Sequence, residues 1–315
     1  MTDLQRISIV IPVYNAENTI GRLVDELVAN LEHLYALEII LVNDRSMDSS
    51  EQVCTEIYKK YPSSIRFLSL AKNVGEHNAV MAGLNHVTGA YAVIMDDDFQ
   101  NPVGEVERLI EYALQTGQDV VYTYYDKKEH SLVRNIGSVF NDKVANLMLN
   151  KPGDLYLSSF KIIKHALIRE IVKYDLPYPY IDGLILRSTD EIGRLKVQHA
   201  AREDGKSGYT FRKLVSLWLN MFTNFSVLPL RFATLLGFLF AGLGFVFGVL
   251  TILERITQPG LPQGYTLMFV FIAVVSGVQL ISIGLLGEYI GRLFLSQSKK
   301  PQYTIRRAYL GADDE

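Results

Sequence analysis

The first two-thirds of the chain alternates short apolar runs with segments in which apolar residues recur every three or four positions. Strands are predicted at RISIVIPVY, EIILVND, SIRFLSL, AYAVIMD and DVVYTYY, with helices at 17–34, 49–61, 76–87 and 103–115 between them. Strands that alternate with helices are typical of a doubly wound, mostly parallel sheet. We therefore expect an α/β fold that binds its ligands at the carboxyl ends of the strands.

Two long uncharged apolar runs follow in the last third of the chain. They cover residues 232–253 and 265–287, and each exceeds the roughly 20 residues that cross a bilayer core. Buried core helices are the alternative, but two neighbouring runs of full bilayer length favour membrane spans. The short connection between the runs is rich in proline and glycine, as a turn requires. The pattern predicts a helical hairpin that crosses the membrane twice.

Basic residues predict the orientation of this hairpin. Before the first run come Arg202, Lys206, Arg212, Lys213 and Arg231, after the second come Arg292, Lys299, Lys300, Arg306 and Arg307, and the turn has only Arg255. Because loops with excess Lys and Arg stay in the cytoplasm, we expect the head and both termini there. The first residues have neither the basic start nor the long apolar core of a signal peptide.

The segment that precedes the first apolar run is itself amphipathic. Leu214, Leu217, Trp218, Met221 and Phe222 recur at helical spacing, which predicts a helix lying along the membrane surface, with an ordinary core helix as the alternative. The chain is therefore divided into a head, an interfacial helix, a two-helix membrane domain and a cytosolic tail, at 1–209, 210–230, 231–292 and 293–315.

Composition and charge exclude several functional classes. The net charge is −3, which does not suggest a nucleic-acid partner. The single cysteine, Cys54, cannot form an intramolecular disulfide, and no Cys/His cluster suggests zinc. Neither the G-x-G-x-x-G fingerprint after the first strand nor the P-loop motif is present, which disfavours a dinucleotide-dependent dehydrogenase and a P-loop NTPase.

Three consecutive acids, Asp96, Asp97 and Asp98, directly follow the fourth predicted strand. Packing three like charges costs free energy unless a cation compensates them. Carboxylates on a turn suit Mg²⁺ or Mn²⁺, which bind oxygen and bridge to phosphates, and Gln100 can add a carbonyl oxygen. The alternative is a solvated acidic turn, or a cap for the helix that begins near Val103.

Five motifs follow one another along the chain: IVIPVYNAE (9–17), LVNDRSMDSS (41–50), KNVGEHNAVMAGL (72–84), MDDDFQNP (95–102) and LLGEYIGR (285–292). In their order and spacing they resemble the polyprenyl-phosphate glycosyltransferases of family 2, which have the GT-A fold. The resemblance covers nearly the whole chain. It implies metal-dependent, inverting transfer of one sugar from a nucleotide-sugar, with UDP the favoured nucleotide, to undecaprenyl phosphate at the cytosolic face of the bacterial inner membrane, for modification of an envelope glycan.

The resemblance also implies roles for individual residues. Asp96 and Asp98 match the two acids of the D-x-D motif, and Gln100 the glutamine that completes the Mg²⁺ or Mn²⁺ site. The donor positions are matched by Pro12, Tyr14, Glu17, Asp44, Lys72, Gly75, Asp97 and Lys206, among which Asp44 is implied to read the base. Arg202 matches an arginine near the donor phosphates, and the acceptor phosphate is assigned to Arg134, Ser138 and Lys128. Asp96, Asp98, Arg134 and Arg202 are therefore the implied catalytic residues.

The sequence departs from the family pattern at several of these places. Arg45 replaces a glycine, Tyr125 an arginine, Gly208 a lysine and Ser159 an acid. Relatives often form tetramers, and the small residues at 237, 241, 244 and 248 would permit close helix packing. Two other functions remain open: a processive polysaccharide synthase, although its Q-x-x-R-W motif is missing, and a non-catalytic, membrane-anchored nucleotide-sugar sensor or scaffold.

Overall fold

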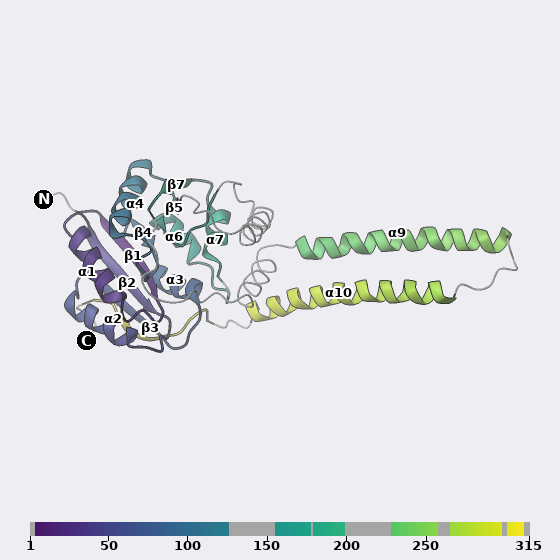
Figure 1. Cartoon of the computed structure of the whole chain (residues 1–315), viewed down its shortest axis with the longest axis horizontal. Coiled ribbons are helices and arrows are strands. Elements are labelled where there is room, and N and C mark those ends of the chain that lie inside the picture. Colours follow the sequence, from purple (N-terminus) through teal and green to yellow (C-terminus); the bar gives the residue numbers. More distant parts are fainter. Residues whose placement is uncertain are drawn as a thin grey trace. The chain divides into compact units, whose positions relative to one another are not determined.

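The computed structural model describes residues 4–125, 155–177, 179–198, 228–257, 265–297 and 301–311. The chain divides into two compact units, shown in Figure 1. The head unit comprises Met1–Tyr209 together with Lys300–Glu315, and the second unit comprises Thr210–Lys299. The last residues of the sequence therefore belong to the same unit as the first.

The described part of the head contains an eight-stranded sheet in the order β7-β5-β6-β4-β1-β2-β3-β8. Strands β4, β1, β2 and β3 pair in parallel, as do β5 and β7, whereas β6 and β8 are antiparallel to their neighbours. This mixed sheet confirms the expected α/β fold. The strands are β1 (Arg6–Val13), β2 (Ala36–Asn43), β3 (Ile65–Leu70), β4 (Tyr91–Ile94), β5 (Val120–Tyr124), β6 (Lys161–Lys164), β7 (Ile192–Lys196) and β8 (Ile305–Tyr309).

Helices cover both faces of this sheet, with α1, α2 and α4 on one side and α3 on the other (Figure 1). Alternate residues of β1 face the two layers: Ile9 shares a core with Leu23 of α1, and Val10 faces Gly83 of α3. A Cβ on Gly83 would lie 2.4 Å from Val10 Cγ1, so only glycine allows this helix so close. The head helices are α1 (Ile20–Leu31), α2 (Ser50–Lys60), α3 (Glu76–Leu84), α4 (Val103–Thr116), α6 (His165–Ile171) and α7 (Ile181–Ser188).

The C-terminal strand β8 closes the β3 edge of the sheet, a feature that the sequence analysis did not predict. The Tyr309 ring stacks on Phe67 at 5.7 Å between centroids and contacts Tyr58 at 5.2 Å. The Tyr58 hydroxyl donates to the Gly311 carbonyl oxygen at 3.0 Å, and the Gln302 amide donates to the Tyr174 carbonyl oxygen at 2.6 Å. Residues 301–311 are therefore an integral part of the head.

Replacing Tyr309 with Ala should lower the free energy of unfolding by about 1–3 kcal/mol, because each aromatic pair contributes about 0.5–1.5 kcal/mol beyond its buried area. Denaturant unfolding of the full-length protein in detergent would measure the loss. Arg306→Ala, at an exposed position of the same strand, is the matched control and should change stability little. Equal effects of the two substitutions would contradict a role for the ring contacts.

The second unit contains two long helices, α9 (Leu228–Thr257) and α10 (Tyr265–Gln297). Each includes an 18-residue stretch long and apolar enough to cross a membrane, Ala233–Leu250 and Val274–Gly291. Large apolar side chains such as Phe238 and Phe245 are more than 70% exposed, as expected if lipid rather than protein covers them. The interfacial helix predicted at 210–230 lies almost wholly outside the described residues.

The small residues of α9 differ in what they face. A Cβ on Gly244 would lie 3.1 Å from Phe271 of α10, so this glycine permits the close approach of the two helices. A Cβ on Gly237 or Gly248 would meet nothing within 4 Å in the part of the chain that the structure describes. The predicted oligomer is not tested by this hairpin and stays a prediction.

Candidate active site

The polar segments that follow β1, β2, β3 and β4 lie at one edge of the sheet. The parallel register aligns Val13 with Asn43, and Asn43 with Ser69, so these strands end together. Hydrogen bonds then join the segments: the Asn15 backbone N–H donates to Ser46 Oγ at 3.1 Å, and the Tyr14 backbone N–H donates to Asp97 Oδ2 at 3.1 Å. Segments up to about 80 positions apart in sequence therefore form one site at the edge where open α/β sheets bind ligands.

The acidic turn after β4 brings three carboxyl groups, Asp96, Asp97 and Asp98, together in sequence. The pKa of Asp97 is raised to about 7, chiefly by burial and also by the neighbouring carboxylates Asp96 and Asp98, against the opposing effect of the Tyr14 N–H. Asp98 is only 6% exposed, and its Oδ1 accepts the Gln100 backbone N–H at 3.1 Å. Carboxylate oxygens are the kind of donor that a hard divalent cation prefers.

The acidic turn has a strained backbone at Phe99, and a side chain from α1 supports it. Phe99 has a φ of 58°, an uncommon conformation for a bulky residue, and it brings Gln100 back toward Asp98. The guanidinium carbon of Arg22, on α1, lies 4.3 Å from the centroid of the Phe99 ring. This cation–π contact contributes to holding the turn in its conformation.

Asp96 and Asp98 fit a metal that is completed by the substrate. Within the described ranges, no three His, Cys, Asp or Glu side chains converge as a ready-made metal site. Mg²⁺ usually takes one or two protein carboxylates and completes its shell with water and substrate phosphates. Two acids of the turn would meet this requirement where a substrate supplied the phosphate oxygens.

Asp44 orders the segment after β3. Its Oδ1 accepts the Val74 backbone N–H at 2.7 Å, and its Oδ2 accepts the Gly75 backbone N–H at 2.8 Å. The carboxyl group is buried, and burial raises its pKa although these hydrogen bonds oppose the shift. Gly75 has a φ of 88°, which explains why glycine stands there. The contacts of Asp44 are therefore with the Lys72–Gly75 turn, and its implied role in reading a base stays a prediction.

The other predicted donor residues lie on the same edge. Tyr14 and Lys72 are exposed, and Pro12 is half-buried at the end of β1. Glu17 is exposed and accepts the Ser49 backbone N–H through Oε2 at 2.8 Å. Arg45, which stands where the family has glycine, keeps the left-handed conformation at a φ of 57°.

A group of hydroxyl side chains, which the sequence did not reveal, surrounds the acidic turn on the β5–β6 side. Ser159 Oγ donates to Asp96 Oδ2 at 2.7 Å, and the Tyr125 hydroxyl donates to Asn101 Oδ1 at 3.2 Å. The Tyr125 ring meets Tyr156 edge-on at 6.0 Å. Burial raises the pKa of Tyr125, so its hydroxyl stays protonated. Tyr125 and Ser159, which stand where the family has an arginine and an acid, are thus neutral groups that contact the turn.

Several predicted site residues cannot be placed. Lys128, Arg134, Ser138, Arg202 and Lys206 lie outside the described residues, and their implied roles stay predictions.

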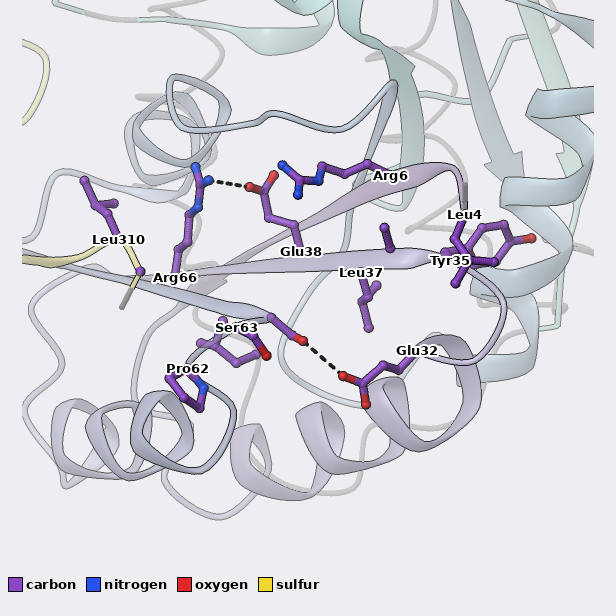
Figure 2. A pocket seen from close by; sticks show the side chains of 14 residues that line it. Leu4, Arg6, Glu32, Tyr35, Leu37, Glu38, Pro62, Ser63, Arg66 and Leu310 are labelled. Atoms are coloured by element: carbon purple, nitrogen blue, oxygen red, sulfur yellow. Dashed lines mark hydrogen bonds and ion pairs between the residues drawn. The ribbon is translucent and has the colours of Figure 1, made fainter. Parts of the chain in front are cut away.

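A cavity of about 300 Å³ lies at the opposite edge of the sheet, where β1, β2 and β3 begin. Figure 2 shows Arg6, Glu38 and Arg66 on one wall, with Glu38 paired to the Arg66 guanidinium at 3.0 Å. Since open α/β sheets bind ligands at the carboxyl ends of their strands, we do not assign the donor to this cavity.

A mixed α/β sheet with an acidic turn at its ligand-binding edge defines the GT-A class of glycosyltransferases. Residues 8–171 match the model of glycosyl transferase family 2, and residues 228–293 match that of the GtrB C-terminal hairpin. The chain belongs to glycosyl transferase family 2, and it is a glycosyltransferase.

Similar curated proteins match along nearly the whole chain. The undecaprenyl-phosphate 4-deoxy-4-formamido-L-arabinose transferase of Yersinia pestis (strain Pestoides F) is 34% identical over 324 aligned positions, covering 98% of this chain and 95% of that protein. The enzyme of the same name from Klebsiella pneumoniae (strain 342) is 33% identical over 316 positions, covering 96% and 94%. The match therefore includes both the head and the hairpin.

Solved structures support the fold. Glucosyl-3-phosphoglycerate synthase from Mycobacterium tuberculosis, in complex with uridine diphosphate, has a TM-score of 0.52 and 18% identity, covering 69% of this chain and 77% of that one. The same enzyme in complex with Mn²⁺, UDP-glucose and phosphoglyceric acid has a TM-score of 0.51 and 19% identity, with the same coverage. At this identity the likeness shows the fold alone.

Proposed function

We propose that this glycosyltransferase moves one sugar from a nucleotide-sugar, preferably UDP-linked, to undecaprenyl phosphate, with inversion at the anomeric carbon. The observation that carries the proposal is the 34% identity to an undecaprenyl-phosphate sugar transferase over 98% of the chain. The name of that relative makes 4-deoxy-4-formamido-L-arabinose the first sugar to test. The product would be a lipid-linked sugar for an envelope glycan.

On the donor side, the edge formed by Tyr14, Glu17 and the Lys72–Gly75 turn would hold the nucleotide. Asp96 and Asp98, with Gln100, would hold Mg²⁺ or Mn²⁺. When bound, such a cation would neutralise charge on the donor diphosphate and on the departing nucleotide. Before the donor arrives, the hydrogen bond of Asp97 joins the segments after β1 and β4, and that of Asp44 joins the segments after β2 and β3. This preorganisation is the contribution of the described residues to the rate.

On the acceptor side, the attacking oxygen belongs to a phosphate and is already anionic. A strong general base is therefore unnecessary, and the requirement becomes positioning and charge neutralisation. We assign the acceptor phosphate to Arg134 and Ser138, with Lys128, and the donor phosphates to Arg202 and Lys206. Arginine suits this task because its planar guanidinium matches a phosphate with two parallel hydrogen bonds.

The membrane topology has support from the position of β8. This strand pairs with β3, so residues 301–311 lie on the same side of a membrane as the rest of the head. The chain between the head and β8 must then cross an even number of times, which agrees with the two candidate spans α9 and α10. The excess of Lys and Arg at both flanks favours the cytoplasmic side. We therefore place the head at the cytosolic face of a bacterial inner membrane.

The acceptor lipid explains why the enzyme acts at the membrane. Exposing a polyprenyl chain to water would cost about 0.8 kcal/mol for each CH₂ group, so the enzyme must come to the lipid. A hairpin that anchors the head would keep the enzyme at the membrane that holds this lipid.

The test of the proposed function uses full-length protein in nanodiscs with undecaprenyl phosphate, Mg²⁺ or Mn²⁺, and a panel of UDP-, GDP- and dTDP-linked sugars. We expect one donor, UDP-linked, to give a lipid product that carries a single sugar. A polymer would indicate a processive synthase instead. Absence of any lipid-linked sugar with the whole panel, the formamido sugar included, would reject the proposed reaction and favour a non-catalytic scaffold.

A further inference from the structure

Ser159 stands beside the acidic turn, in a place where the family resemblance leads one to expect an acid. Its hydroxyl donates to Asp96 Oδ2 at 2.7 Å, across 63 positions of sequence. The contact follows from the sheet, because β6 begins at Lys161, which is paired with Ile94 at the end of β4. The residues just before β6 and just after β4 are therefore neighbours.

The segment that carries Ser159 is held in place by hydrogen bonds of its neighbour, Ser158. The Ser158 side chain is buried, and its Oγ accepts the Phe160 backbone N–H at 3.1 Å. Thr123 of β5 donates its hydroxyl to the same oxygen at 3.1 Å and to the Phe160 carbonyl oxygen at 2.7 Å. Ser158 and Phe160 are buried on either side of Ser159, and Ser159 itself is half-buried beside the acidic turn.

We propose that Ser159 is a positioning residue that holds the Asp96 carboxylate in the orientation required for binding a divalent cation. This inference rests on the proposed metal-dependent transfer. Carboxylates that bind metals are usually held by further hydrogen bonds, and removing such a partner typically weakens metal affinity about 10- to 100-fold. A hydroxyl serves this purpose without adding a fourth negative charge to Asp96, Asp97 and Asp98.

The experiment measures Mn²⁺ affinity by electron paramagnetic resonance on full-length protein in nanodiscs, with and without UDP. Ser159→Ala should weaken Mn²⁺ binding about 10- to 100-fold. Ser159→Thr, which keeps the hydroxyl, should restore most of the affinity. In transfer assays, the apparent KM for Mn²⁺ should rise more than kcat falls, a change that a merely structural role would not produce.

Ser64→Ala is the matched control. Ser64 also donates its hydroxyl to a carboxylate, Glu32 Oε1 at 3.2 Å, but at the opposite edge of the sheet. Ser64→Ala should leave the Mn²⁺ affinity unchanged. The thermal unfolding midpoints of all variants should confirm that each is folded. Wild-type affinity in Ser159→Ala would overturn the inference and leave the proposed transfer intact. A wild-type protein that transfers sugar but binds no Mn²⁺ would overturn the inference together with the proposed metal site.

Discussion

Asp98→Asn should lower kcat for sugar transfer by about 10²- to 10³-fold, the usual cost of losing one preorganised electrostatic partner of the transition state. The substitution removes one negative charge while keeping the shape of the side chain. The asparagine carbonyl oxygen can still accept the Gln100 backbone N–H, so the strained turn at Phe99 should keep its conformation. The loss would therefore report on charge rather than on folding.

Sugar transfer and UDP binding are the two measurements that test whether Asp98→Asn acts through the metal. Transfer to undecaprenyl phosphate should fall as stated, and the Mn²⁺-dependent part of UDP binding should disappear. Asp25→Asn is the matched control, because Asp25 is a half-exposed acid paired with Lys60 at 2.8 Å on the α1–α2 surface. That control should lose little activity. Transfer by Asp98→Asn within about threefold of wild type would exclude Asp98 as a metal ligand.

The parallel centre of the sheet was predictable because its strands are mostly apolar. β1 and β2 are buried on both faces, so they appear as continuous apolar runs bounded by polar turns. The helix predicted at 17–34 is found at Ile20–Leu31, and that predicted at 76–87 at Glu76–Leu84. The strands and helices predicted for residues 1–125 were confirmed as elements, and their ends shifted by a few residues because local turns decide where helices begin and end.

The two antiparallel strands were missed for different physical reasons. β8 is an edge strand with exposed Arg306 and Arg307, and it has no apolar alternation to reveal it. It forms because β3 offers unpaired backbone groups at its open edge. β6 has only four residues and runs directly into α6. Its Lys161 is a charged residue in a buried position, and it is buried there with its ion-pair partner Asp182, which lies 21 positions away in sequence.

The edge of the sheet at which the acidic turn lies was predictable, but the contacts of the turn were not. The position of Asp96–Asp98 after an apolar strand indicated this edge, and the bound cation stays a prediction. The hydrogen bonds of Asp97 to the Tyr14 N–H, and of Ser159 to Asp96, join residues more than 60 positions apart. Such pairs depend on strand order and register, which motif spacing does not contain.

The Lys161–Asp182 ion pair joins β6 to α7 and supports the segment that carries Ser159. Both residues are less than 10% exposed. The Tyr122 hydroxyl donates to Asp182 Oδ1 at 2.8 Å, and the Lys161 ammonium lies 5.0 Å from the Tyr122 ring centroid. Burial and the Asp182 carboxylate raise the pKa of Tyr122 well above its usual value, so this hydroxyl remains a donor.

Asp182→Ala should lower the free energy of unfolding by about 3–5 kcal/mol, because it leaves the Lys161 ammonium buried without a partner. Denaturant unfolding of the full-length protein in detergent would measure the loss. Lys173→Ala, which breaks the exposed pair with Glu170, should cost at most about 1 kcal/mol.

The double variant Lys161→Met/Asp182→Leu decides what the pair contributes. Apolar side chains of similar volume often replace a buried ion pair at little cost, so the double variant should be more stable than Asp182→Ala alone. If the unpaired charge is the cause of the loss, the two substitutions will be strongly non-additive. A double variant less stable than either Lys161→Met or Asp182→Leu alone would show instead that packing around Tyr122 requires the Lys161 and Asp182 side chains, and that the charge is secondary.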